Sequence, residues 1–233
     1  QFYAKPVDED FDMVIKSFDK FMQTVDFVQE VRLIGGEPLM YKRVDEVAKH
    51  VLGYKNFGQL KVNTNGTIVP NEAKLKIFED PRVFFDISNY GKISRNVEKL
   101  IEKLKEKKIA HVASSVSEWQ DVGKIVETNR PDQVNKEIFG NCCINRGLTL
   151  LHGNLYLCPF SANATNLKAI KYAKEEILDM KTEKSKLKKQ IHNLYFNTNF
   201  LEACKSCNGR DHNVTRVEAA LQAKEPLTYK LVD

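Results

Sequence analysis

Cysteine is absent from the first 141 residues of this 233-residue chain, and all five cysteines lie in the remaining 92. An odd number of thiols cannot all pair, and a chain of this size can bury a core without disulfide staples. The sequence therefore argues against a disulfide-built scaffold. The clustered thiols indicate metal or redox chemistry in a reducing compartment, so we expect a cytoplasmic protein.

Long apolar runs, an excess of one charge and loop-forming residues are also scarce. No stretch approaches the roughly 18 apolar residues that span a bilayer, and no signal-peptide or lipidation pattern is visible, so we expect no membrane partner. The 36 basic and 31 acidic residues give a net charge of +5, a mixed surface that does not indicate nucleic acid. Seven prolines and 11 glycines favour long helices and strands over loops.

The first 115 residues alternate between the two hydrophobic periods. The expected helices are 8–25, 41–52, 71–79 and 96–107, and the expected strands are 31–34, 59–63, 83–87 and 109–115. Strands and helices that alternate in this way predict an α/β fold with a parallel sheet and right-handed crossovers, either open or curled into a barrel.

The alternation stops after Ser115. Residues 119–140 are expected to be irregular, and 148–157 predict a β-hairpin with its turn at Gly153-Asn154. Two further helices are expected, a highly charged one over 167–190 and a closing one over 214–224. A smaller module is expected to begin near Gly140, which gives domains at 1–139 and 140–233.

Functional groups of parallel α/β folds gather at the carboxyl ends of the strands, and three of the expected strands end in polar turns. The first is Gly35-Gly36-Glu37-Pro38, where two glycines permit close backbone approach and the carboxylate can hold an ammonium. The others are Asn63-Thr64-Asn65-Gly66 and Asp86-Ile87-Ser88-Asn89. Each alone reads as a turn with capping residues, but three on consecutive strands favour a site.

The strand that leads into Gly35-Gly36-Glu37-Pro38 and the later strand that ends in Thr64-Asn65-Gly66 resemble the radical S-adenosylmethionine (radical SAM) superfamily. The resemblance covers most of residues 1–115 and implies a partial (β/α)6, TIM-like barrel. It further implies that Glu37 and the backbone of Gly35 and Gly36, next to Pro38, hold the methionine ammonium of S-adenosylmethionine. Asn65, Ser88 and Asn89 would face the carboxylate or ribose of the same molecule.

One part of the family pattern is missing from this sequence. The CxxxCxxC loop that holds the catalytic [4Fe-4S] cluster is absent, and we expect its ligands upstream of Gln1. In the family, an electron from a donor such as flavodoxin or ferredoxin cleaves S-adenosylmethionine and yields a 5′-deoxyadenosyl radical. That radical removes a hydrogen atom from an unactivated carbon. A protein that has lost the cluster and binds without chemistry is the alternative.

A second group of residues is formed by Cys143, Cys158, Cys204 and Cys207. From spacing alone, four soft thiolates suit zinc as well as an iron–sulfur cluster. The pattern CX9GX4C followed by CX2C resembles the SPASM/twitch extensions of radical SAM enzymes. The resemblance implies a small α+β domain with a β-hairpin, in which these four cysteines hold an auxiliary [4Fe-4S] cluster.

Cys142 is the thiol that this pattern leaves over. We interpret it as a buried spare cysteine or, alternatively, as a hydrogen-atom donor to a substrate radical. His152 and His212 flank the cluster cysteines and are weaker candidates for a substrate pocket.

The substrate is expected to be a carbohydrate or another small molecule that is oxidised or epimerised. The segments 117–123 and 158–162 resemble radical SAM proteins associated with polysaccharide assembly. A peptide-modifying radical SAM enzyme is the alternative, and a zinc-stabilised interaction module would explain the cysteines alone.

Overall fold

A computed structural model describes Tyr3 and residues 6–232 and divides the chain into two compact units. The first, which we call the sheet unit, comprises Val25–Ser117 and Glu218–Ala220. The second, the cysteine unit, comprises the chain up to Thr24, Glu118–Val217 and the residues from Leu221 onward. No helix of the described residues is long and apolar enough to cross a membrane.

Four parallel strands in the order β1-β2-β3-β4 form the sheet unit. The strands are β1 (Val28–Leu33), β2 (Phe57–Thr64), β3 (Val83–Asn89) and β4 (Ala110–Ser115). The connections contain α2 (Val44–Leu52), α3 (Glu72–Ile77), α4 (Val97–Glu106) and the short 3-10 helices η1 (Pro38–Met40) and η2 (Gly91–Ile93). The predicted α/β class and parallel sheet are confirmed, and the arrangement is compatible with part of an α/β barrel.

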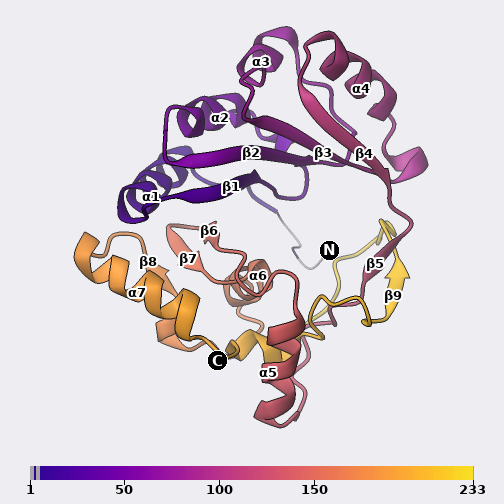
Figure 1. The fold of residues 1–233 in the computed structure, drawn as a ribbon. Helices are drawn as coiled ribbons and strands as arrows, with labels where there is room; N and C mark the ends of the chain where they lie inside the picture. The colour runs from indigo at the N-terminus through magenta and orange to yellow at the C-terminus, as the bar shows by residue number, and fades with distance from the viewer. Residues whose placement is uncertain (1–2, 4–5, 233) are drawn as a thin grey trace. The chain divides into compact units, whose positions relative to one another are not determined.

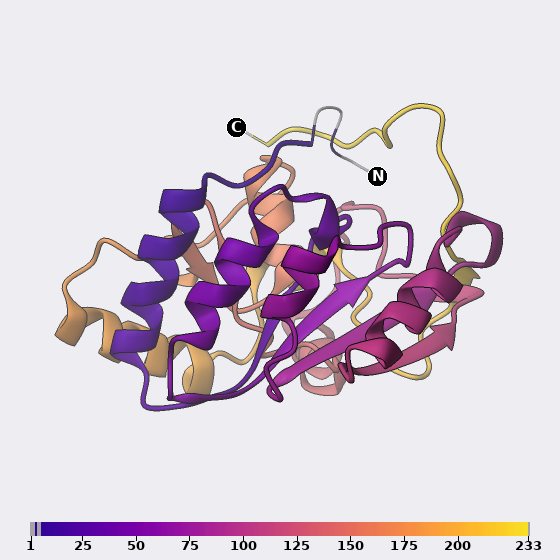
Figure 2. The same ribbon diagram turned by 90° about the horizontal axis from the view of Figure 1, so that it is seen from above.

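The helices α2, α3 and α4 cover one face of this sheet (Figure 1, Figure 2). Alternate strand residues point toward them, because successive side chains of a strand face opposite sides. These side chains and their helical partners are fully buried and apolar: Leu60, Val62, Phe85, Ile87, Leu75, Leu100 and Leu104. Burial of this apolar layer fixes the strand register, since a slip of one residue would turn it toward the other face.

The register brings the carboxyl ends of the strands together. Thr64 pairs with Ile87 across β2 and β3, and Asn89 pairs with Ser115 across β3 and β4. The polar turns that follow β1, β2 and β3 therefore lie along one edge of the sheet unit.

The cysteine unit contains helices and short strands. Its helices are α1 (Phe11–Thr24), α5 (Asp132–Asn141), α6 (Pro159–Asn166), α7 (Lys184–Asn197) and the 3-10 helices η3 (Lys174–Glu176) and η4 (Glu202–Ser206). Its antiparallel sheet has the order β6-β7-β8, formed by β6 (Thr149–Leu151), β7 (Asn154–Tyr156) and β8 (Leu178–Asp179). The short strands β5 (Glu118–Gln120) and β9 (Arg216–Glu218) pair with each other.

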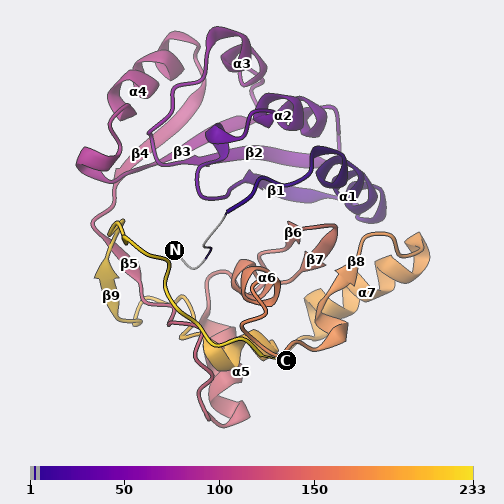
Figure 3. The same cartoon turned by 180° about the vertical axis from the view of Figure 1, so that it is seen from behind.

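Packing inside the cysteine unit joins segments that are far apart in the sequence. Helix α1 packs against α7 and β6, while α6 packs against the β6–β7 hairpin and η4 (Figure 3). Helix α5 also contacts η4. The ends of α5 and α6 are thus gathered around the Cys204–Cys207 segment.

The predicted hairpin is confirmed, but its turn is His152-Gly153 and not Gly153-Asn154, because Asn154 is already the first residue of β7. His152 and Gly153 both have positive φ angles, 48° and 78°, as a type I′ turn requires.

Three other predictions of local structure were wrong. The segment 119–140 contains β5 and most of α5, and the charged helix begins only at Lys184 because Leu178 is buried in a strand beside β7. The expected closing helix over 214–224 contains β9 instead, since pairing with β5 outweighs the helix propensity of that segment.

Candidate functional site

Glu37 connects the turn after β1 to the end of β2. Its carboxylate accepts hydrogen bonds from the Leu39 N–H at 3.0 Å, the Thr64 hydroxyl at 2.9 Å and the Asn65 N–H at 2.7 Å. An ionised carboxylate offers about four acceptor positions, so three donors leave little capacity for a ligand. The main role of Glu37 in this structure is therefore to connect the turn after β1 to the end of β2.

Gly35 and Gly36 are exposed, and a Cβ atom added at either position would meet nothing within 4 Å. Neither glycine has a φ angle in the left-handed region. Packing and backbone conformation therefore do not explain why glycine stands here. The open backbone is suited to a ligand that approaches closely, because no side chain keeps it away.

The turn after β2 is fixed by its own hydrogen bonds. The Asn65 Oδ1 atom accepts from the N–H and the hydroxyl of Thr67, at 3.0 and 2.6 Å. Gly66 has a φ of +70°, and a Cβ there would lie 3.1 Å from the Cβ of Val97, so glycine is needed for the fold. The buried Ser94 hydroxyl, which we did not predict, donates to the Asn65 carbonyl at 2.6 Å.

Ser88 and Asn89, both half-buried, are the last two residues of β3, whereas the sequence predicted that they form a turn after it. The Asn89 Oδ1 accepts from the Gly91 N–H at 2.9 Å, and the Ser88 carbonyl lies 3.3 Å from the Ser94 hydroxyl. Ser94 thus joins the loops that follow β2 and β3. The predicted residues of the sheet edge are brought together, and several of their oxygens also stabilise the turns themselves.

The sheet face opposite α2, α3 and α4 carries polar residues, of which Asn63 and Asp86 belong to the predicted polar segments while Glu30 and Lys61 were not predicted. Glu30 forms an ion pair with Lys61 at 2.7 Å, and the Asn63 Nδ2 donates to Asp86 at 3.5 Å. The Asn63 Oδ1 is buried and has no partner in the described part of the chain. Alternation within β1 and β2 was the signal that could have revealed this row, since Glu30 and Arg32, and then Gln59, Lys61 and Asn63, occupy alternate positions.

Four thiols of the cysteine unit lie in or next to helical elements. Cys142 is the C-cap of α5, Cys158 is the N-cap of α6, and Cys204 and Cys207 lie in and directly after η4. All four are half-buried, whereas Cys143 is exposed. The structure therefore brings Cys158, Cys204 and Cys207 together with Cys142, and leaves Cys143 at the surface.

Burial dominates the electrostatics of these thiols. Desolvation raises the pKa of Cys204 to about 12 and that of Cys207 to about 11, and it also raises the pKa of Cys158. Backbone N–H groups oppose this rise, since Leu201 donates to the Cys204 sulfur at 3.4 Å and Gly209 to the Cys207 sulfur at 3.3 Å.

Arg130 organises the Cys204–Cys207 segment. Its Nη2 donates to the carbonyls of both cysteines, at 2.8 and 2.7 Å, while its Nε is buried and lacks a partner among the described residues. Its positive charge lowers the pKa of Cys207 against the larger effect of burial. An unpaired guanidinium N–H beside soft thiols fits an anionic metal–thiolate group.

The described residues do not form a ready-made site for a single metal ion. Within the described residues, no three His, Cys, Asp or Glu side chains form a group that could hold one metal ion. A zinc ion would hold its thiolates roughly 3.8 Å from one another, because each Zn–S bond measures about 2.3 Å. A cluster that carries its own iron and sulfide atoms needs thiolates that stand further apart.

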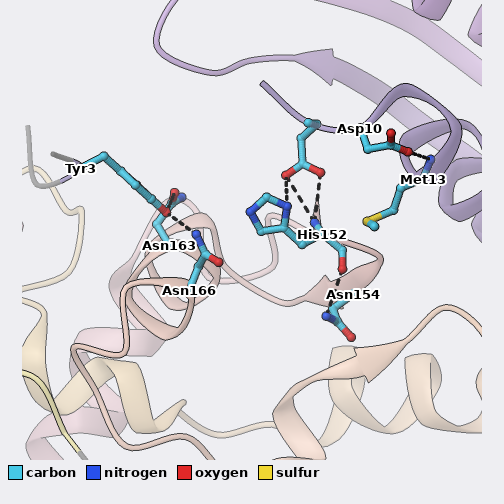
Figure 4. Close-up of polar contacts among 8 residues, drawn as sticks. Tyr3, Asp10, Met13, His152, Asn154, Asn163 and Asn166 are labelled. Atoms are coloured by element: carbon cyan, nitrogen blue, oxygen red, sulfur yellow. Dashed lines mark hydrogen bonds and ion pairs between the residues drawn. The ribbon is translucent and has the colours of Figure 1, made fainter. Parts of the chain in front are cut away.

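His152 lies at the hairpin turn, where its ring Nδ1 forms a contact of 2.9 Å with the Glu9 carboxylate. The His152 backbone N–H donates to the same carboxylate at 3.3 Å. Figure 4 shows this turn together with Tyr3, whose hydroxyl donates to Asn163 of α6 at 2.9 Å. The ring of His152 thus holds the segment before α1 on the hairpin.

Glu176 lies near Cys204 and lines an open depression of about 300 Å³ beside α7. Burial raises the pKa of this carboxyl to about 7, and the hydrogen bond that it accepts from the Glu202 N–H at 2.9 Å acts in the opposite direction. We did not predict this residue, because a single glutamate in a charged segment carries no sequence signal.

Comparisons with known proteins give one partial similarity to report. Over 47 residues the chain is 38% identical to GTP 3',8-cyclase of Pelotomaculum thermopropionicum. The matched stretch is 20% of this chain and spans only 14% of that protein. No family model matches the chain. The similarity supports a relationship with the radical SAM superfamily, at the level of the superfamily alone.

Proposed function

We propose that this chain is a radical SAM enzyme whose sheet unit binds S-adenosylmethionine at the carboxyl edge of β1, β2 and β3. The observation that carries the proposal is the open backbone of Gly35 and Gly36 beside the anchored Glu37 carboxylate. The partial similarity to GTP 3',8-cyclase supports the same superfamily.

The methionine ammonium would lie against the backbone of Gly35 and Gly36, because an ammonium has three donors and needs carbonyl oxygens nearby. The Glu37 carboxylate would add its negative charge and hold the turn in place. Asn65, Ser88 and Asn89 would face the carboxylate or ribose from the ends of the neighbouring strands.

When bound to a [4Fe-4S] cluster and reduced, S-adenosylmethionine supplies a radical that removes a hydrogen atom from an unactivated carbon. The protein binds and orients the reactants and excludes water from them. The polar sheet face, with Lys61, Asn63 and Asp86, supplies hydrogen-bonding groups that suit a hydroxyl-rich substrate. We propose a carbohydrate-type substrate that is oxidised or epimerised, with flavodoxin or ferredoxin as the electron donor.

The gathered thiols of the cysteine unit fit an auxiliary [4Fe-4S] cluster. Cys158, Cys204 and Cys207 would be three of its ligands, with the fourth from the Cys142-Cys143 pair. The unpaired N–H of Arg130 would be available to the negative charge of such a metal–thiolate group.

The function is tested with protein expressed from the complete gene and purified without oxygen. We expect calorimetric binding of S-adenosylmethionine and reductant-dependent release of 5′-deoxyadenosine. A nucleotide sugar deuterated on the ring should transfer deuterium into that product, whereas transfer from a deuterated peptide would favour the peptide-modifying alternative. Protein that binds no S-adenosylmethionine would contradict the proposal.

A further inference from the structure

We infer that Cys142, and not Cys143, supplies the fourth thiolate beside Cys158, Cys204 and Cys207. This inference rests on the metal site of the proposed function, and it assigns that site differently from the spacing of the sequence, which pointed to Cys143.

The backbone turns the two neighbouring thiols in different directions. Cys142 ends α5, where its N–H donates to the Phe139 carbonyl at 3.2 Å, and its φ and ψ of −73° and 122° are extended. Side chains of adjacent residues in extended backbone point to opposite sides, so only one of the two sulfurs can face the other cysteines. Cys142 is half-buried and Cys143 is exposed.

The segment that follows Cys207 holds this arrangement in place. The Cys143 N–H donates to the Arg210 carbonyl at 2.9 Å, so the chain after α5 runs beside the chain after η4. Three residues earlier in that chain is Cys207. The hydrogen bond therefore holds the Cys142-Cys143 pair beside the chain that follows the Cys204–Cys207 segment.

Contacts between the helical elements indicate the same neighbours. Helices α5 and α6 both contact η4. Cys142 ends α5, Cys158 precedes α6, and Cys204 lies within η4, so these three thiols come from elements that pack together. Cys207 follows η4 directly and completes a set of four.

A ligand role changes the interpretation of both residues. Binding of a metal requires that the Cys142 thiol release its proton to solvent, after which the thiolate sulfur is committed to the metal. Cys142 would then be unable to return a hydrogen atom to a substrate radical. Cys143 would be the spare thiol, and its exposure makes it the cysteine most open to alkylation in the folded protein.

The test compares Cys142→Ala with Cys143→Ala, a matched pair of adjacent substitutions, and Cys158→Ala serves as the reference for a lost ligand. Iron and sulfide per chain, absorbance and electron paramagnetic resonance are measured after anaerobic reconstitution of the full-length protein. We expect Cys143→Ala to match the wild type. Cys142→Ala should lose its metal to a chelator at least about tenfold more readily, as Cys158→Ala does.

Alkylation of the native wild-type protein, followed by peptide mass spectrometry, gives a second readout that does not depend on activity. We expect rapid labelling of Cys143 and protection of Cys142. The reverse pattern, or a Cys143→Ala variant that loses the metal while Cys142→Ala keeps it, would overturn the inference. So would a wild-type protein whose thiols bind neither iron nor zinc.

Failure of the proposed function has a different signature. If the four thiols hold zinc, or hold a cluster in a protein that binds no S-adenosylmethionine, the matched pair still identifies the fourth ligand. In that case the radical SAM assignment is contradicted, and the assignment of Cys142 stands on its own result.

Discussion

The Thr64 hydroxyl lies 2.9 Å from both oxygens of the Glu37 carboxylate, and this contact joins the end of β2 to the turn after β1. Thr64 is 3% exposed, so its hydroxyl has little access to water as an alternative partner. The same hydroxyl oxygen lies 3.2 Å from the Gly66 N–H and can accept its hydrogen bond. The residue that carries the charge of the proposed site is thus held by a residue of the neighbouring strand.

Thr64→Val should reduce the free energy of unfolding by about 1 to 3 kcal/mol, because the shape is kept while the carboxylate and the Gly66 N–H lose a partner. Binding of S-adenosylmethionine should weaken with it, since the Glu37 turn loses its anchor. Denaturant unfolding and titration calorimetry measure the two effects. Thr215→Val, at an exposed position, is the control and should change neither quantity. If Thr64→Val behaves like this control, the contact between Thr64 and Glu37 contributes to neither stability nor binding.

Gly36→Ala should separate stability from binding. The added Cβ meets nothing within 4 Å, so the free energy of unfolding should stay the same or rise by about 0.4 to 1 kcal/mol as the unfolded chain loses freedom. Affinity for S-adenosylmethionine should fall, because the methyl group occupies the open backbone. Gly58→Ala is the contrasting variant, since its Cβ would lie 2.7 Å from the Gln29 carbonyl and should destabilise the sheet. Unchanged affinity in Gly36→Ala would remove Gly36 from the site.

Arg130→Met should weaken the Cys204–Cys207 segment. Two carbonyls lose a charged donor, which costs about 2 to 3 kcal/mol of unfolding free energy. Loss of the positive charge should also speed release of bound metal to a chelator. Arg43→Met, which removes an exposed ion pair with Glu46, should stay within about 0.5 kcal/mol of wild type. If the two substitutions change the unfolding free energy and the rate of metal release equally, Arg130 does not stabilise the Cys204–Cys207 segment in particular.

Glu176 should make stability depend on pH. Burial raises its folded pKa from 4.5 to about 7, so the folded state favours the neutral carboxyl. The resulting stabilisation is complete below pH 4.5 and is lost as the pH rises through 7, an effect of roughly 2 to 3 kcal/mol. Unfolding measured from pH 4.5 to 8 should show this decline in the wild type and a flatter profile in Glu176→Gln. If the wild type and Glu176→Gln lose stability equally with rising pH, a group other than Glu176 causes the pH dependence.

The hydrophobic pattern of the first 115 residues was sufficient to predict the four strands of the sheet unit and the helices between them. Period-2 and period-3.6 patterns report which residues of one segment share a face, and that information is local. The same reasoning placed Gly35, Glu37, Asn65 and Asn89 at one edge, because parallel strands bring their carboxyl ends together.

Only the tertiary structure shows which helices and strands pack together when they are far apart in the sequence. The helix over 11–24 was predictable, but not its packing against α7 and β6. The segment 216–218 became a strand because β5 lies beside it, which outweighs its own propensity.

The choice between Cys142 and Cys143 was also beyond the sequence, since adjacent residues differ only in the direction of their side chains. The backbone at the end of α5 sets that direction, and the hydrogen bond to Arg210 holds the pair beside the chain after η4. The three donors to Glu37 come from its own turn and from the end of β2, 27 residues away in the case of Thr64. Sequence determined which residues were available, and non-local pairing decided which of their groups meet.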